Sequence, residues 1–394
     1  MRVRGFSAAA VQAGIKYKDR LDLGLIFSEV PAVAAGVFTT NRVKAAPVLL
    51  SMERLRGGRV QAVLVNSGNA NACTGEQGMD IAVATSALAA EALEIDEEQV
   101  QVASTGVIGL PMPSEPFARS MKELVGALSP DGFDDFAQAI MTTDTRQKTA
   151  MAQVDINGVC VSILGVAKGS GMIMPDMATM LCFVVTDAQI VFPVLNNALR
   201  TGVNHSFNRI TVDGDTSTND MVLILANGAA DNDWIDEESL EAAACFTEAL
   251  QGVLKDLALQ IVADGEGATK LVTVRVVGAR EIEGAMNAAQ TIANSALVKT
   301  AFFGEDPNWG RILAALGRSD CVFNPELVSI AFDDVFLVHK GITVGIEAEQ
   351  QAQEVMHRDQ FTVTVDLHEG MAEAEVFTCD LTCDYVKINA DYRS

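Results

Sequence analysis

The sequence contains few histidines. Four occur in 394 residues, and none stands at metal-ligand spacing from another: His205, His339, His357 and His368. A zinc site of the usual His and Cys kind is therefore not expected. The chain also lacks a G-x-S-x-G turn, which excludes the nucleophile elbow of the α/β-hydrolases. A serine or cysteine activated by a distant histidine stays open, because such triads are assembled in space.

Positive charge is scarce as well. The chain has 28 Lys and Arg against 52 Asp and Glu, a formal net charge of −24. Such a surface repels polyanions, so we expect neither nucleic acid nor an anionic membrane as a partner. No run approaches the roughly 18 apolar residues that a membrane span needs, and no secretory signal is visible. The seven cysteines are an odd number without paired spacing, which favours reduced thiols in a cytoplasmic protein.

What the sequence does contain is an alternation of strand-like and helix-like segments. Its length predicts two or three domains, or one layered α/β domain with a smaller one. Apolar periodicity predicts strands over 60–66, 99–104, 159–166, 180–186 and 272–277, and helices over 77–93, 115–126, 235–263 and 285–300. Phe361–Leu367 and Ala374–Cys379 flank a short polar turn and predict a hairpin. We place a domain boundary near residue 280.

Four turns rich in small residues adjoin these elements, at 66–69, 104–106, 168–171 and 264–267. Such turns leave backbone N–H groups free to face a ligand, although ordinary tight turns have the same composition. None fits the P-loop or dinucleotide-binding pattern. The acidic residues Asp213, Asp215 and Asp220 could bind a divalent cation. The alternative is a turn whose Asp and Thr side chains satisfy its own backbone.

The stretch 168–181, KGSGMIMPDMATML, carries the most specific chemistry. Ala178 precedes Thr179, and a buried strand follows at once. A threonine at a strand start is ordinary by propensity. Alternatively, the Thr179 hydroxyl attacks the preceding carbonyl in an N→O acyl shift, and hydrolysis of the resulting ester leaves Thr179 with a free α-amine. That amine could then serve as general base for its own hydroxyl, which permits acyl transfer without a histidine.

This stretch resembles the self-cleavage motif of the ArgJ family, the ornithine acetyltransferases (glutamate N-acetyltransferases) of arginine biosynthesis. Further segments agree with the family in order along the whole chain. They are 35–41 (AGVFTTN), 65–75 (VNSGNANACTG), 104–109 (STGVIG), 141–144 (MTTD), 211–220 (TVDGDTSTND), 264–270 (DGEGATK), 303–311 (FGEDPNWGR) and 389–394 (NADYRS).

The resemblance implies a fold and a processing event. The expected fold class is α/β (α+β), with a layered α/β/β/α core of the self-processing DmpA/ornithine acetyltransferase type and a smaller C-terminal α+β domain. Cleavage between Ala178 and Thr179 would give an alpha chain, 1–178, that forms the first part of the core. The beta chain would complete the core with 179–280 and form the smaller domain with 281–394. Family members usually assemble as α2β2 heterotetramers.

The resemblance also implies a ping-pong reaction. Thr179 would take acetyl from N-acetylornithine as an ester and pass it to glutamate, with Thr105 and Gly106 as the oxyanion hole. Substrate-binding positions carried over from the family are Thr142, Lys168, Thr179, Glu266, Asn389 and Ser394. We expect Lys168 to hold a substrate carboxylate and Glu266 a substrate ammonium. No cofactor or metal is expected, although some family members accept acetyl-CoA as an acetyl donor.

Two other functions remain open at this point. The first is an N-terminal-threonine amidohydrolase or aminopeptidase, which would use the same chemistry with water as the acceptor. The second is a non-catalytic protein that holds an amino acid in the glycine-rich turns. Acetate release that is independent of glutamate would favour the hydrolase. Binding without an acyl-enzyme would favour the second alternative.

Overall fold

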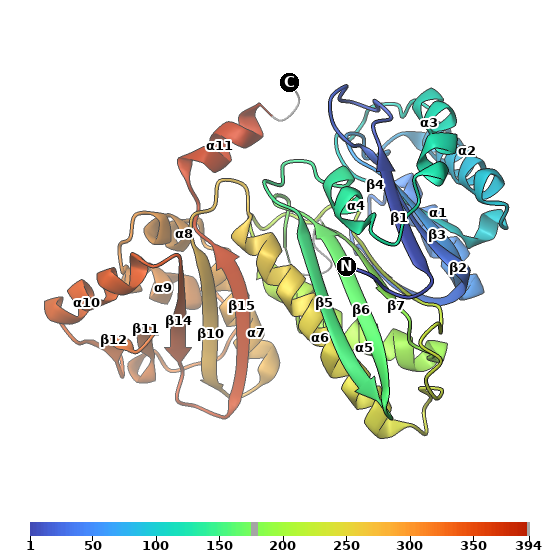
Figure 1. Cartoon of the computed structure of the whole chain (residues 1–394). Coiled ribbons are helices and arrows are strands. Elements are labelled where there is room, and N and C mark those ends of the chain that lie inside the picture. The colour runs from blue at the N-terminus through green and yellow to red at the C-terminus, as the bar shows by residue number, and fades with distance from the viewer. Residues whose placement is uncertain (175–179, 392–394) are drawn as a thin grey trace. The chain divides into compact units, whose positions relative to one another are not determined.

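The computed structural model describes residues 1–174 and 180–391 and contains two compact units (Figure 1). The larger unit comprises 1–172, 180–208 and 215–261, and the smaller one 173–174, 209–214 and 262–391. Each unit is built around its own sheet. The domain division inferred from the sequence, 1–178, 179–280 and 281–394, stays a prediction. In the described part of the chain, no helix is long and apolar enough to cross a membrane.

An eight-stranded sheet forms the centre of the larger unit, with the order β4-β3-β2-β9-β7-β6-β5 and β1 paired to β2. Its strands are β1 (Phe6–Val11), β2 (Leu23–Phe38), β3 (Arg59–Asn66), β4 (Val100–Ser104), β5 (Lys148–Ile156), β6 (Val159–Lys168), β7 (Leu181–Thr186) and β9 (Met221–Ala226). Its helices are α1 (Ala46–Arg54), α2 (Gly75–Leu93), α3 (Glu115–Gly126), α4 (Phe133–Ala139), α5 (Phe192–Asn204) and α6 (Leu240–Ala263), whose last residues belong to the smaller unit.

Strand β2 is long and contributes to two halves of this sheet. Its first part, 23–28, pairs with β1, and its last part, 33–38, pairs with β9. The register against β3 is interrupted between Phe27 and Ala32, where Pro31 stands. Proline has no N–H to donate to a neighbouring strand, so it belongs at such an irregularity. The sheet thus changes direction within β2.

Alternation along the strands produces a four-layered unit. Val63 and Val65 of β3 belong to a core that also contains Leu164, Phe183 and Leu223 from the other half of the sheet. Leu64 points the other way, into a second core with α1, α2 and α3. Helix α6 covers the outer face of the second half, beside β5 and β6 (Figure 1). A Cβ at Gly165 of β6 would lie 2.6 Å from Leu257 of this helix. The predicted α/β/β/α core is therefore confirmed.

The smaller unit has a seven-stranded sheet with the order β13-β12-β11-β14-β10-β15-β8. Its strands are β8 (Ile210–Thr211), β10 (Leu271–Ala279), β11 (Ser329–Phe332), β12 (Val335–His339), β13 (Ile342–Thr343), β14 (Gln360–Asp366) and β15 (Ala372–Cys379). Its helices are α7 (Ile282–Ala293), α8 (Ala296–Phe303), α9 (Trp309–Leu316), α10 (Ile346–Met356) and α11 (Cys383–Ala390).

The predicted hairpin between 361–367 and 374–379 is wrong. Both strands exist as β14 and β15, but β10 lies between them, and Val274 pairs with Val363 on one side and Val376 on the other. The connecting residues pass around the end of β10, where Glu369 N–H donates to the Gly278 carbonyl. The turn is long enough to cross one strand, a distance of about 10 Å for two strand spacings.

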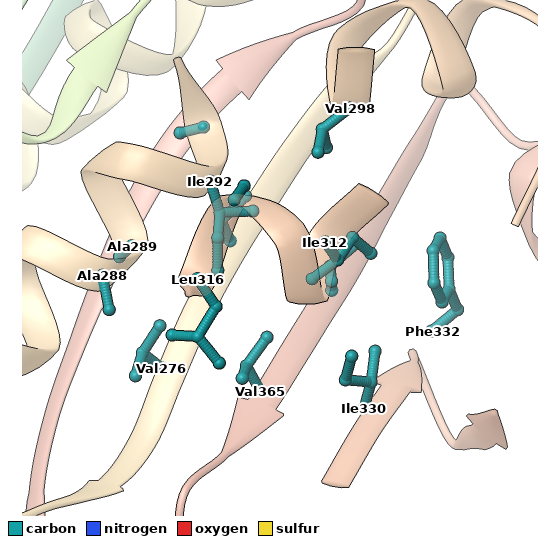
Figure 2. Packing of buried hydrophobic residues seen from close by; sticks show 14 of the residues in the cluster. Val276, Ala288, Ala289, Ile292, Val298, Ile312, Leu316, Ile330, Phe332 and Val365 are labelled. Atoms are coloured by element: carbon teal, nitrogen blue, oxygen red, sulfur yellow. The ribbon is translucent and has the colours of Figure 1, made fainter. Parts of the chain in front are cut away.

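Helices α7, α8 and α9 bury an apolar face against this sheet (Figure 2). In that figure, Ile292 and Leu316 lie between the helices and Val276 and Val365 of the sheet. The helix predicted over 285–300 is interrupted, because α7 ends before Asn294 and α8 begins after Ser295.

The inner core of the larger unit gives a stability test. Phe136 of α4 is completely buried and meets Phe183 of β7 edge-to-face, with ring centroids 5.7 Å apart. We expect Phe136→Ala to lower the free energy of unfolding by about 3–5 kcal/mol, because it leaves a cavity. Chemical denaturation would measure this loss. Phe192→Ala is the control, since Phe192 is 45% exposed and its removal should cost little. Equal losses in the two variants would contradict the layered core.

Candidate active site

Two of the glycine-rich turns lie side by side in the larger unit. Strands β3 and β4 are parallel and end in register at Asn66 and Ser104, whose side chains share a 2.6 Å hydrogen bond. Gly106 adopts a φ of +135°, and a Cβ there would lie 2.3 Å from the Gly68 carbonyl carbon. No side chain fits between the two turns at this point, so position 106 requires glycine.

The predicted oxyanion donors Thr105 and Gly106 occupy this junction. The backbone N–H of Thr105 donates to the Asn66 carbonyl at 3.0 Å, so it cannot also serve an oxyanion. The Thr105 hydroxyl and the Gly106 N–H form no hydrogen bond with the described residues. If Thr105 acts as a donor, it therefore acts through its side chain.

Asn219 joins the same turns from a distant part of the sequence. Its amide nitrogen donates to the carbonyls of Ala70 and Ser104, at 2.7 and 2.8 Å. Its amide oxygen accepts from the Thr218 hydroxyl at 2.7 Å. Asn219 is buried, so these bonds replace its contacts with water. The motif 211–220 thereby fixes the carbonyl that directly precedes Thr105.

Thr142 and Lys168, predicted to bind substrate, are in direct contact. Lys168 ends strand β6, and its ammonium donates to the Thr142 hydroxyl at 2.7 Å. The same ammonium lies 3.7 Å from Asp144 Oδ2. Lys168 is buried apart from a few per cent of its side chain, so its charge acts with little screening.

Asp144 is the counter-charge of this cluster. It accepts from Lys148 Nζ and from the Gly169 N–H, both at 2.7 Å, and from the Thr142 N–H at 2.9 Å. Burial opposes ionisation of this carboxyl, but the charges of Lys168 and Lys148 outweigh it and hold the pKa well below its ordinary value. Asp144 is therefore a carboxylate that fixes the start of the turn 168–171.

In the smaller unit, two predicted binding residues that are far apart in sequence also meet. Asn389 of α11 donates to Glu266 Oε2 at 2.7 Å. Glu266 is buried in the turn 264–267. Thr382, which caps α11, donates its hydroxyl to the Gly267 carbonyl at 2.8 Å and so ties the helix to this turn.

Three predicted site residues, Ala178, Thr179 and Ser394, lie outside the described residues. Ile173 and Met180, on either side of the segment 175–179, donate their backbone N–H groups to aspartates of the motif 211–220. Asp213 accepts the Ile173 N–H at 2.8 Å, and Asp220 accepts the Met180 N–H at 3.0 Å. These two aspartates accept backbone N–H groups that lie 40 residues earlier in the chain, not those of their own turn. Within 1–174 and 180–391, no three His, Cys, Asp or Glu side chains are arranged to hold a metal ion.

Sequence reasoning missed Asp144, Lys148 and Asn219. A weak signal for the first two was present, because Asp144 ends the segment MTTD and Lys148 follows it by four residues. Nothing in the local sequence identifies Asn219, since the carbonyls that it binds lie more than a hundred residues away.

The chain is similar to known proteins of one family over nearly its whole length. A model of the ArgJ family matches residues 7–394. The chain belongs to the ArgJ family. It is 58% identical to the arginine biosynthesis bifunctional protein ArgJ of Desulfotalea psychrophila and 53% identical to that of Geobacter sulfurreducens, over the full length of all three chains. The chain is also 45% identical to the ArgJ chain in a crystal structure from Bacillus halodurans, with a TM-score of 0.50. That match covers 53% of this chain and 97% of the Bacillus halodurans chain. The family resemblance seen in the sequence is thereby confirmed.

The charge cluster around Asp144 yields a test of stability. Asp144→Asn leaves Lys148 and Lys168 buried without a carboxylate, so we expect a loss of about 3–5 kcal/mol in the free energy of unfolding near pH 7. The stabilisation by Asp144 is present above its ordinary pKa of 3.8 and is lost as pH falls through the lower folded pKa. The difference in stability between the wild type and the variant should therefore begin to narrow below about pH 4 and keep narrowing as pH falls further.

Urea denaturation at several pH values would measure this difference. Asp131→Asn is the matched control, because Asp131 forms an exposed ion pair with Arg2 and should change stability little. A difference between wild type and Asp144→Asn that is the same at pH 3 and pH 7 would refute the role of the carboxylate charge.

Proposed function

We propose that the protein is an acyltransferase of arginine biosynthesis, which moves the acetyl group of N2-acetyl-L-ornithine to L-glutamate. The observation that carries this proposal is the identity of 58% to an arginine biosynthesis bifunctional protein ArgJ over the full length of both chains. The layered core and the paired glycine-rich turns are consistent with it.

The enzyme would be made as a precursor that cleaves itself between Ala178 and Thr179. The Thr179 hydroxyl adds to the Ala178 carbonyl, the amide C–N bond breaks, and the nitrogen takes the hydroxyl proton, which leaves an ester. Water then hydrolyses the ester and frees the Ala178 carboxylate and the Thr179 hydroxyl, beside the amine that the breaking of the C–N bond released. In support, the Bacillus halodurans chain is matched over 97% of its length yet covers 53% of this chain. That share is expected of one fragment of a precursor cut near its middle.

In the mature enzyme, the Thr179 hydroxyl would attack the acetyl carbonyl of N-acetylornithine, with the new α-amine as base. Collapse of the tetrahedral intermediate releases ornithine and leaves acetyl on Thr179. Glutamate then attacks this ester through its amine and leaves as N-acetylglutamate. We assign the Thr105 hydroxyl and the Gly106 N–H to the oxyanion, because neither donates a hydrogen bond to another described residue.

Binding roles follow from charge. We assign Lys168, with Thr142, to a substrate carboxylate, although part of its charge is already balanced by Asp144. Glu266 and Asn389 of the smaller unit form one polar pair, which we assign to a substrate ammonium. Thr179 and Ser394 complete the proposed binding set.

The transfer needs no cofactor, since the acetyl group moves from one amino acid to another through Thr179. Acetyl-CoA is a second acetyl donor that an assay with glutamate would detect. We propose an α2β2 heterotetramer of the two fragments, located in the cytoplasm.

Processing and exchange provide the main test. We expect purified protein to give two fragments by intact mass, one of which begins at Thr179, and to convert N-acetylornithine and glutamate into ornithine and N-acetylglutamate. Thr179→Ala should stay in one piece and be inactive, because the nucleophile is gone. An intact and active wild-type chain would overturn the mechanism. Acetate release at a rate unaffected by glutamate would favour an amidohydrolase instead.

The oxyanion assignment can be tested with two glycines of the same loop. Gly106→Ala should reduce kcat on the order of 100–1000-fold, because the added Cβ forces the N–H away from its position. Gly109→Ala is the control: Gly109 also has a positive φ, of +83°, but a Cβ there would meet no atom within 4 Å. Initial-rate assays would compare the two variants. Equal losses would mean that backbone strain, and not the oxyanion hole, explains the effect.

A further inference from the structure

Asp220 lies beside the start of strand β7. It is the last residue before β9, and β7 and β9 are parallel, with Leu181 opposite Met221. The Asp220 side chain reaches across to the neighbouring strand, where Oδ1 accepts the Met180 N–H at 3.0 Å. The Met180 carbonyl accepts from the Met221 N–H at 3.2 Å. The N–H and the carbonyl of Met180 are therefore both hydrogen-bonded to residues at the start of β9.

Burying the Asp220 side chain at this position is unfavourable in free energy. Asp220 is 1% exposed, and its Oδ2 forms no hydrogen bond with the described residues. Burial raises the pKa of Asp220 well above its ordinary value, although the Met180 N–H, the charge of Lys168 and nearby hydroxyls act against this. A buried carboxyl with an oxygen that accepts no hydrogen bond lowers the free energy of unfolding. Its presence therefore indicates a role other than stabilising the fold.

The position of Met180 suggests what Asp220 contributes. Met180 directly follows Thr179, so after cleavage it would be the residue that connects the new N-terminus to the sheet. Chain ends fray unless they are tied down. A misplacement of about 1 Å in a reacting group can reduce a rate on the order of 100-fold. Whatever holds the Met180 N–H therefore restricts where the Thr179 hydroxyl and amine can lie.

We propose that Asp220 is a positioning residue for Thr179, which it fixes by accepting the Met180 N–H before and after self-cleavage. This inference rests on the proposed function, since it takes Thr179 as the nucleophile. The required property is a hydrogen-bond acceptor at Oδ1. A negative charge is not required, because the Met180 N–H is a neutral donor.

Variants of Asp220 separate these properties. Asp220→Asn keeps an oxygen acceptor of the same reach, so we expect the self-cleavage rate and kcat to stay within about 10-fold of wild type. Asp220→Leu keeps the branched arrangement of heavy atoms and has no acceptor, and we expect both rates to fall on the order of 100-fold. The KM for N-acetylornithine should change less than kcat in either variant, because the side chains assigned to substrate binding other than Thr179 keep their places.

Asp187 offers a matched control at the other end of β7. It is also buried, its Oδ1 accepts the Ser162 N–H at 2.7 Å, and its Oδ2 has no hydrogen bond among the described residues. Asp187 differs from Asp220 in that its Oδ2 lies 3.7 Å from Arg4 Nε. Asp187→Leu should lower the thermal unfolding midpoint as Asp220→Leu does. It should leave the self-cleavage rate and kcat close to wild type, because no reacting residue follows Asp187.

The experiment measures self-cleavage by intact mass and exchange by initial rates, with circular dichroism to verify folding. If Asp220→Leu does not fold, Asp220→Ser replaces it, since its shorter side chain cannot reach the Met180 N–H. Asp220→Leu with wild-type rates, or Asp220→Asn as slow as Asp220→Leu, would overturn the proposal. If wild type itself is not cut before Thr179, the proposed function fails first, whatever the variants do.

Discussion

The arrangement of the larger unit depends on the bend in strand β2. The first part of this strand pairs with β1 and β3, and its last part pairs with β9. The two halves of the sheet therefore face each other across one core instead of extending in one plane. As a result, the loop before β9 reaches the ends of β3 and β4, where Asn219 binds the carbonyls of Ala70 and Ser104. Elements that are distant along an open sheet become neighbours.

The buried charges of Asp144, Lys148 and Lys168 are stabilised by pairing with one another. Asp144 accepts from one ammonium and two backbone N–H groups, and it lies near a second ammonium. Removing Asp144 would leave two buried ammonium groups without their carboxylate, which is far more costly than losing a surface ion pair. An enzyme with an overall charge of −24 thus keeps a cation, Lys168, at the end of β6, where an anionic substrate group could approach it.

Local patterns predicted much of this structure. The strand over 60–66 was readable because it is a continuous apolar run that is buried on both faces. The helix over 115–126 was readable because its apolar periodicity reflects a single buried face. The failures were of a different kind. β14 and β15 are close in sequence, but β10 comes from ninety residues earlier and separates them, and no local pattern encodes that insertion. The helix break at 294–295 was missed because both helices contribute to one continuous apolar face.

For the candidate site too, the sequence identified residues but not the contacts between them. Family resemblance identified Thr105, Gly106, Thr142, Lys168, Glu266 and Asn389, and the structure places several of them in contact within each unit. It did not indicate that the Thr105 N–H is already used by Asn66, or that Asp144 holds Lys168 in place. Those facts depend on distances between residues of different strands, which a single sequence does not contain.

The strand order has a consequence for the two fragments. In the series β2-β9-β7-β6, the outer strands would belong to the alpha chain and the inner strands to the beta chain. The fragments would therefore be interleaved within one sheet, and their separation would require breaking the ladders β2–β9 and β6–β7 together with the core beneath them. Such a pair has no independent dissociation equilibrium, because coming apart and unfolding are the same event. The cut would change the chemistry of one threonine while leaving the cooperativity of the fold intact.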